Sequence, residues 1–200
     1  MKLSNIGLLL ALFILSSCAS SYEMINPSSL NYTSTDTKND VTLEYKYDVL
    51  GTKYAKKEIK KGINVVAVKI TNNSDSDLVF GQDIKLAYEN GMEFPVVEND
   101  EVFKSLKQFT AGYLFYLLLT PMKLTVQKDG ELPKTTPIGY GVGPGLAGIN
   151  MIRSSTANSQ FETELLEFDI NGATIKKGET KTGLVGIRSD NYDSIKIKMD

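Results

Sequence analysis

The stretch Ile63-Asn64-Val65-Val66-Ala67-Val68-Lys69-Ile70 (INVVAVKI) has the composition of a central strand in a β-sheet. In an extended chain successive side chains point to opposite faces, and here apolar side chains fall on both faces near the middle of the run. A strand that is apolar on both faces is covered on both sides. We therefore expect this stretch to lie at the centre of a β-domain.

Shorter runs with strand character flank this stretch, and turn signals separate them. Before it, residues 41–47 alternate between apolar and polar side chains. After it, the polar turn TNNSDSD (residues 71–77) leads into further short runs at residues 78–80, 84–88 and 92–94. Three more runs, at residues 173–175, 184–187 and 195–199, close the chain. Short strands at this spacing predict an antiparallel β-sandwich.

Two of these hairpins carry a resemblance to a known family. The segments VAVKITNNSDSDLVF (66–80) and TIKKGETKTGLVGI (174–187) resemble hairpins of the immunoglobulin-like β-sandwich in small bacterial envelope lipoproteins. The resemblance covers about half of the chain, and it consists of packing and turn patterns. It implies a mainly β fold, an immunoglobulin-like antiparallel sandwich, and it carries no catalytic residues across.

The middle of the chain, at about residues 100–167, follows a helical pattern instead. Apolar residues recur at intervals of three and four from Val102 to Leu117, which predicts a helix from about Asp100 that ends before Pro121. A second amphipathic helix is predicted over 151–167. We expect an apolar helical hairpin inserted between two strands of the sandwich.

Two uncharged segments, AGYLFYLLL (111–119) and IGYGVGPGLAGINMI (138–152), dominate this insertion, and each is shorter than the 18 or more residues that span a bilayer. Glycines four apart allow another backbone to approach closely. Two interpretations stay open: the hairpin is a buried pair that caps the sandwich, or it contacts a membrane or a membrane protein partner. The residues expected at such a contact are Tyr113, Leu114, Phe115, Leu117, Leu118, Gly141 and Gly145.

The amino terminus resembles the signal of a bacterial lipoprotein. Lys2 precedes the apolar run IGLLLALFIL (6–15), and Leu15-Ser16-Ser17-Cys18 resembles a lipobox. The resemblance implies processing at Leu15, Ser16 and Ser17, removal of residues 1–17, and attachment of a diacylglycerol to the Cys18 thiol. Because Ala19 is not acidic, it also implies an outer-membrane anchor in the cell envelope, facing the periplasm.

The remaining residues extend this domain plan. Residues 18–40 are rich in Ser, Thr and Asn, so we expect a flexible tether, followed by the β-sandwich domain over 41–200. Histidine is absent and Cys18 is the only cysteine, which excludes Ser-His-Asp and Cys-His catalysis and the common zinc sites. With a formal net charge of −2, the chain has no basic field for nucleic acid. We expect no enzymatic activity, cofactor or metal.

Several weaker patterns have structural explanations. Residues 143–148 match G-x-G-x-x-G, but no buried strand precedes the glycines. Residues 73–77 imitate the start of a calcium loop, but the glycine and the glutamate that such a loop needs are missing. We interpret Glu162, Glu164 and Glu167 as the polar face of a helix. We interpret the lysine-rich run 56–61 as a solvated strand edge or a contact with lipid head groups.

The sequence thus predicts a lipid-anchored envelope protein with a structural or assembly role, whose apolar insertion contacts a membrane or a membrane protein complex. The alternative is a periplasmic module that binds a glycan or a peptide on the sandwich. That alternative predicts an exposed aromatic patch, with candidates Tyr22, Tyr32, Tyr140 and Tyr192.

Overall fold

The computed structural model describes residues 18–127 and 130–199, so the expected signal-processing residues Leu15, Ser16 and Ser17 lie outside the described residues. The described chain combines antiparallel sheets with three α-helices, and it divides into two compact units. We call residues 22–107 and 159–199 the β unit, and residues 18–21 and 108–158 the helical unit. Antiparallel sheets and a helical segment were predicted, but the helices make the fold mixed α/β rather than mainly β.

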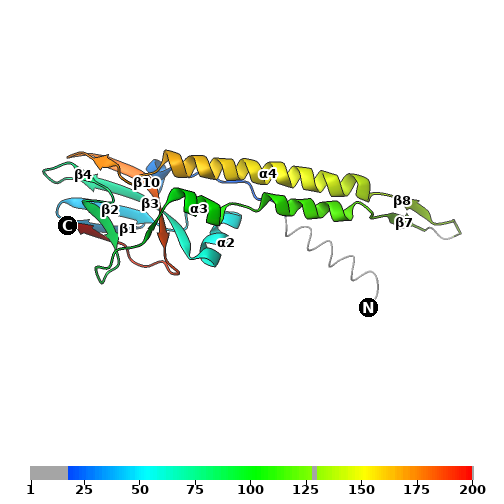
Figure 1. Ribbon diagram of the computed structural model, residues 1–200, viewed down its shortest axis with the longest axis horizontal. Coiled ribbons are helices and arrows are strands. Elements are labelled where there is room, and N and C mark those ends of the chain that lie inside the picture. Colours follow the sequence, from blue (N-terminus) through cyan, green and yellow to red (C-terminus); the bar gives the residue numbers. More distant parts are fainter. Residues whose placement is uncertain (1–17, 128–129, 200) are drawn as a thin grey trace. The chain divides into compact units, whose positions relative to one another are not determined.

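The main sheet of the β unit has five strands in the order β1-β2-β3-β10-β6 (Figure 1). Strand β3 is flanked on both sides and its residues 63–68 are buried, which confirms that INVVAVKI forms a central strand. Strands β3 and β10 pair from Ile63 opposite Arg188 to Thr71 opposite Thr180. The strands are β1 (Ser34–Lys38), β2 (Val41–Lys46), β3 (Ile63–Asn72), β6 (Val96–Val97) and β10 (Thr180–Arg188).

Two smaller antiparallel pairs share a hydrophobic core with the main sheet. The pairs are β5 (Ile84–Ala87) with β11 (Lys196–Met199), and β4 (Leu78–Val79) with β9 (Thr174–Ile175). Their buried side chains join those of β2, β3 and β10 in one cluster. Burial of these apolar side chains is the main source of stability for the unit.

The lysine-rich run 56–61 is not a strand edge, because it belongs to helix α2 (Thr52–Lys61). Tyr54 and Glu58 lie one turn apart and are both buried, whereas Lys56 and Lys60 are exposed. The helix ends at Gly62, which adopts a left-handed conformation (φ 60°) and donates its N–H to the carbonyl of Glu58. The β unit also contains η1 (Pro27–Ser29) and α3 (Asn99–Leu106).

The helical unit is built from a 3₁₀ helix, a short hairpin and most of a long α-helix (Figure 1). Its elements are η2 (Thr110–Leu119), β7 (Leu124–Val126), β8 (Lys134–Thr136) and α4 (Gly139–Glu167), whose last residues belong to the β unit. The single helix predicted from Asp100 is divided at Lys107 into α3 and η2. The second predicted helix begins at Gly139, twelve positions before Met151.

Residues 18–40 were expected to form a flexible tether, and the structure differs. Ala19, Tyr22 and Ile25 are buried, and residues 34–38 form β1, which pairs with β2 from Ser34 opposite Tyr45 to Lys38 opposite Val41. Backbone pairing at the edge of a sheet does not require apolar side chains. A polar segment can therefore form a strand although its composition resembles that of a linker.

Candidate functional site

Helix η2 places its apolar side chains in three rows. A 3₁₀ helix has three residues per turn, so residues i and i+3 lie above one another. The first row, which includes Tyr113 and Tyr116, is buried and packs with Ala147 of α4. Tyr113 was expected at a membrane or partner contact; the structure instead places it inside the helical unit, because the three-residue repeat turns it toward α4.

The other two rows of η2 face solvent and are apolar. One row contains Leu114 and Leu117. The other contains Phe115, which is 72% exposed, and Leu118, which is 74% exposed. These four residues were predicted as contact residues. An α-helical repeat would have buried Leu117, and the 3₁₀ geometry leaves it outside. The ten residues of η2 are long for a 3₁₀ helix, which rarely exceeds three or four.

The glycines of α4 divide between two faces. A Cβ added at Gly143 would lie 2.9 Å from the carbonyl oxygen of Tyr116, and one at Gly139 would overlap the carbonyl oxygen of Leu119. These two glycines therefore let the backbone of η2 pack closely against α4. Gly141 and Gly145, the glycines predicted to contact a partner, have open space where their Cβ atoms would be.

Further exposed apolar residues of the helical unit were not predicted. Leu132 of the β7–β8 connection is 91% exposed. We call the whole set the apolar surface of the helical unit: Phe109, Leu114, Phe115, Leu117, Leu118, Leu124, Val126, Leu132, Tyr140, Ile149 and Ile152. The strand β8, which is only three residues long, gave no separate sequence signal.

The chain next to Cys18 is held firmly by the helical unit. The N–H of Ala19, a residue that is 3% exposed, donates a 2.6 Å hydrogen bond to Oδ1 of Asn150 in α4. Ser20 and Gln108 exchange two hydrogen bonds, from Ser20 N to Gln108 Oε1 at 3.1 Å and from Gln108 Nε2 to Ser20 O at 2.8 Å. Cys18 itself is exposed. A group attached to its thiol is therefore carried by the helical unit itself, one residue from the hydrogen bond to Asn150.

Charge is distributed unevenly between the two units. Residues 108–158 contain four basic and two acidic residues, whereas residues 22–107 and 159–200 contain 17 basic and 22 acidic residues. The helical unit therefore has a formal charge of +2, in contrast to the excess of acid in the rest of the chain. A positive, apolar surface is attracted to anionic lipid head groups.

Two of the four tyrosines expected in an exposed aromatic patch, Tyr140 and Tyr192, are exposed. Tyr22 is buried, Tyr32 donates its hydroxyl to the carbonyl of Pro27, and Tyr192 donates its hydroxyl to Asp48 Oδ1. Tyr140 belongs to the helical unit. The hydrogen bond to Asp48 raises the pKa of Tyr192 to about 12, so this hydroxyl is protonated near neutral pH.

One of the three glutamates assigned to a polar helix face is buried. Glu164 is 2% exposed, and its two carboxylate oxygens accept the N–H of Ile25 at 2.8 and 3.0 Å. Glu162 and Glu167 are exposed, as predicted. Burial, together with Glu164, raises the pKa of the Tyr22 hydroxyl. Sequence periodicity could not identify this role, because the acceptor serves a backbone amide 139 positions away.

The polar turn at residues 73–77 pairs with a second turn. Asp75 lies 2.6 Å from Lys177 Nζ, and Asp77 accepts the backbone N–H of Lys177 at 2.9 Å. In the described residues, no group of three or more acidic or cysteine side chains is placed to hold a metal ion. None of the described helices combines the length and hydrophobicity that crossing a membrane requires.

Comparison of the chain with protein-family models, with curated proteins and with solved structures gave no match.

Proposed function

We propose that this protein is a lipid-anchored component of the bacterial cell envelope, with a non-enzymatic structural or assembly role, and that its helical unit lies on the membrane surface. The acyl group on Cys18 provides the anchor. The apolar surface of the helical unit provides a second contact with the same bilayer. In this proposal the β unit is an immunoglobulin-like sandwich on the periplasmic side of the outer membrane.

The observation that carries the proposal is the hydrogen bond from Ala19 to Asn150, because it leaves no tether between Cys18 and the helical unit. An acylated cysteine lies at the level of the lipid head groups. The helical unit, which includes Cys18 and is fixed to the next residue, lies there too. Its two exposed apolar rows on η2 and its positive charge suit that environment.

Energetics favour two contacts over one. The two acyl chains of a diacylglyceryl group give durable anchoring, and a hydrophobic or basic surface contact adds to it and fixes how the unit lies on the bilayer. Basic residues near an anionic surface add about 1 kcal/mol each. Burying side chains such as Phe115 and Leu118 adds about 1.5–3 kcal/mol each when burial is complete. The helical unit therefore has enough surface to hold the chain against the bilayer.

The first test is mass spectrometry of the processed chain from its native host. We expect an amino-terminal Cys18 that carries a diacylglyceryl thioether. An unmodified thiol on that residue would remove the anchor and with it the reason for placing the helical unit at a membrane.

The second test is flotation of Cys18→Ala protein with vesicles of phosphatidylethanolamine and phosphatidylglycerol. We expect the protein to float with the vesicles, and the double variant Phe115→Asp/Leu118→Asp to stay behind. The matched control is Ile59→Asp/Met92→Asp, which changes two equally exposed apolar residues of the β unit and should float normally. Equal flotation of both double variants would contradict the proposal.

A further inference from the structure

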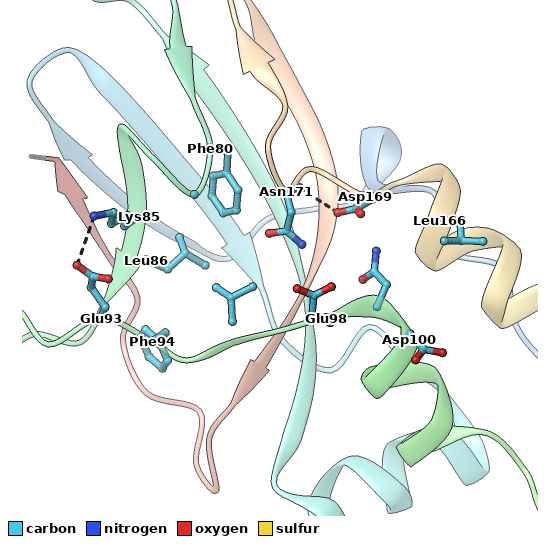
Figure 2. A pocket seen from close by; sticks show the side chains of 13 residues that line it. Phe80, Lys85, Leu86, Glu93, Phe94, Glu98, Asp100, Leu166, Asp169 and Asn171 are labelled. Carbon is cyan, nitrogen blue, oxygen red and sulfur yellow. Dashed lines mark hydrogen bonds and ion pairs between the residues drawn. The ribbon is translucent and has the colours of Figure 1, made fainter.

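A cavity of about 630 Å³ opens on the β unit, where β4, β5, β6 and the ends of α3 and α4 meet (Figure 2). Its volume is in the range of small-molecule sites. Every lining residue belongs to the β unit. The cavity is therefore independent of the helical unit and of the proposed membrane contact.

The floor of the cavity is apolar. Phe80, Leu86 and Phe94 line it, and all three are buried members of the main core. Leu166 and Val96 add exposed apolar side chains to its walls. A ligand that enters this cavity can thus bury a hydrocarbon body against rigid side chains.

The polar lining is strongly acidic, with Glu93, Glu98, Asp100 and Asp169 against the single cation Lys85. Two of the four carboxylates are compensated within the structure. Glu93 pairs with Lys198 at 2.8 Å and Lys85 at 3.7 Å, and Asp100 pairs with Lys104 at 2.6 Å.

The other two carboxylates, Glu98 and Asp169, form no ion pair with any residue that the structure describes. Asp169 accepts only the backbone N–H of Asn171, at 2.9 Å. Glu98 is the residue that precedes α3, but its side chain makes no capping hydrogen bond to the helix. In Figure 2 its carboxylate points toward Asn171 and Asp169. The cavity therefore holds two carboxylates whose charge no ion pair of the described residues neutralises.

A further acceptor without a partner lies in the same lining. Asn99 donates its Nδ2 to the carbonyl of Leu165 at 3.0 Å, but its buried Oδ1 receives no hydrogen bond from the described residues. A buried acceptor that lacks a donor is costly. This oxygen is inaccessible from the cavity, so the polar contacts of a ligand fall on the exposed carboxylates.

We infer that this cavity binds a small organic cation, an ammonium group carried on an apolar body. The hydrocarbon body lies on Phe94, Val96 and Leu166, which the buried Phe80 and Leu86 support from below. The ammonium group lies between Glu98 and Asp169, whose carboxylates accept its hydrogen bonds. Charge complementarity excludes anions of the same shape, and a neutral analogue forfeits the charge-assisted hydrogen bonds.

The test is an NMR titration of isotope-labelled protein, residues 18–200, with three probes of equal length at pH 7: hexylammonium, hexanol and hexanoate. We expect saturable shifts of the amides around Phe80, Phe94 and Asn99 with hexylammonium. Hexanol should bind at least about tenfold more weakly, which corresponds to one charged hydrogen bond, and hexanoate should not bind.

Charge-neutral variants make the test specific. Glu98→Gln and Asp169→Asn should each weaken hexylammonium binding by about fivefold, and Glu89→Gln, which removes an exposed acid outside the cavity, should change nothing. Because Glu98 neither caps α3 nor forms an ion pair, its variant keeps the fold even if Asp169→Asn does not. Absence of saturable shifts, equal binding of hexanol, or equal loss in Glu89→Gln would overturn the inference.

Discussion

The backbone N–H of Ala19 donates to the side-chain oxygen of Asn150, a residue 131 positions further along the chain. Asn150 is itself held by a hydrogen bond from its Nδ2 to the carbonyl of Leu146, at 2.8 Å. The segment after Cys18 is therefore fixed to one side of α4. The residue after the expected lipid attachment site is therefore bound to α4, where a flexible tether was expected.

Replacing Asn150 by Ala should remove this hydrogen bond and free the segment after Cys18 from α4. The Ala19 amide would lose its acceptor in a buried position, and such a loss costs about 1–3 kcal/mol. We expect faster hydrogen exchange at Ala19 and Ser20. The control Ser155→Ala removes an exposed side chain from the same helix, and it should leave both amides protected. Unchanged exchange in Asn150→Ala would mean that the hydrogen bond does not hold this segment.

Two glycines of α4 should respond in opposite directions to the same change. Gly143→Ala places a Cβ 2.9 Å from the Tyr116 carbonyl oxygen, so η2 must move away, at a cost of about 1–3 kcal/mol. Gly145→Ala meets open space and should stabilise the helix by up to about 1 kcal/mol. Chemical unfolding of the two variants measures the difference. Equal effects would show that η2 does not pack on α4 through this face.

Glu58 predicts a pH dependence of stability. Burial and, to a smaller extent, the charge of Asp48 raise the pKa of its carboxyl from 4.5 to about 8, although the hydrogen bond from the Val65 N–H at 2.7 Å opposes the rise. Between these pH values the folded chain holds a proton that the unfolded chain has lost. The free energy of unfolding should therefore fall as the pH rises from about 4.5 to 8, by up to about 1.4 kcal/mol per unit.

The variant Glu58→Gln checks this contribution, since it keeps an acceptor for the Val65 N–H and cannot ionise. Its free energy of unfolding, measured by urea titration at several pH values, should lack the decrease due to Glu58. Parallel curves for the two proteins across pH 4.5 to 8 would contradict the assignment.

Glu164 and Glu162 form a matched pair within α4. Glu164→Ala deprives the Ile25 N–H of its acceptor, and we expect a loss of about 2–3 kcal/mol. Glu162→Ala changes an exposed side chain and should alter stability by less than about 0.5 kcal/mol. Thermal unfolding distinguishes them. Similar melting temperatures for the two variants would refute a structural role for the buried carboxylate.

The strands of the β unit could be predicted because their signal is local. Apolar side chains on both faces of INVVAVKI predicted β3, and the alternation of apolar and polar side chains over 41–47 predicted β2. The polar turn at 71–77 marked the end of β3, which closes at Asn72. These features depend on side chains that are near one another in sequence, and a period of two distinguishes them from a helix.

Features that depend on distant partners could not be predicted. Glu164 is buried because it accepts the N–H of Ile25. Ala19 is held in place because it donates to Asn150 of α4. Helix α2 could have been predicted from its own sequence. Tyr54 and Glu58 are spaced by four, and Gly62 follows the last turn, which is typical of a helix end. The run of lysines was interpreted as a strand edge instead. The intervals of three and four that predicted one helix fit α3 as far as Leu106, and η2 follows a three-residue repeat from Thr110.

Depth measurement with a spin label tests the membrane contact most directly. Cys18 is the only cysteine, so the Cys18→Ala chain accepts a nitroxide at Leu118→Cys or, as a control in the β unit, at Met92→Cys. On addition of anionic vesicles, we predict that the label at position 118 gains access to oxygen and loses access to a water-soluble nickel complex, while the label at position 92 does not change. Equal aqueous access at both positions in vesicle-bound protein would contradict the account.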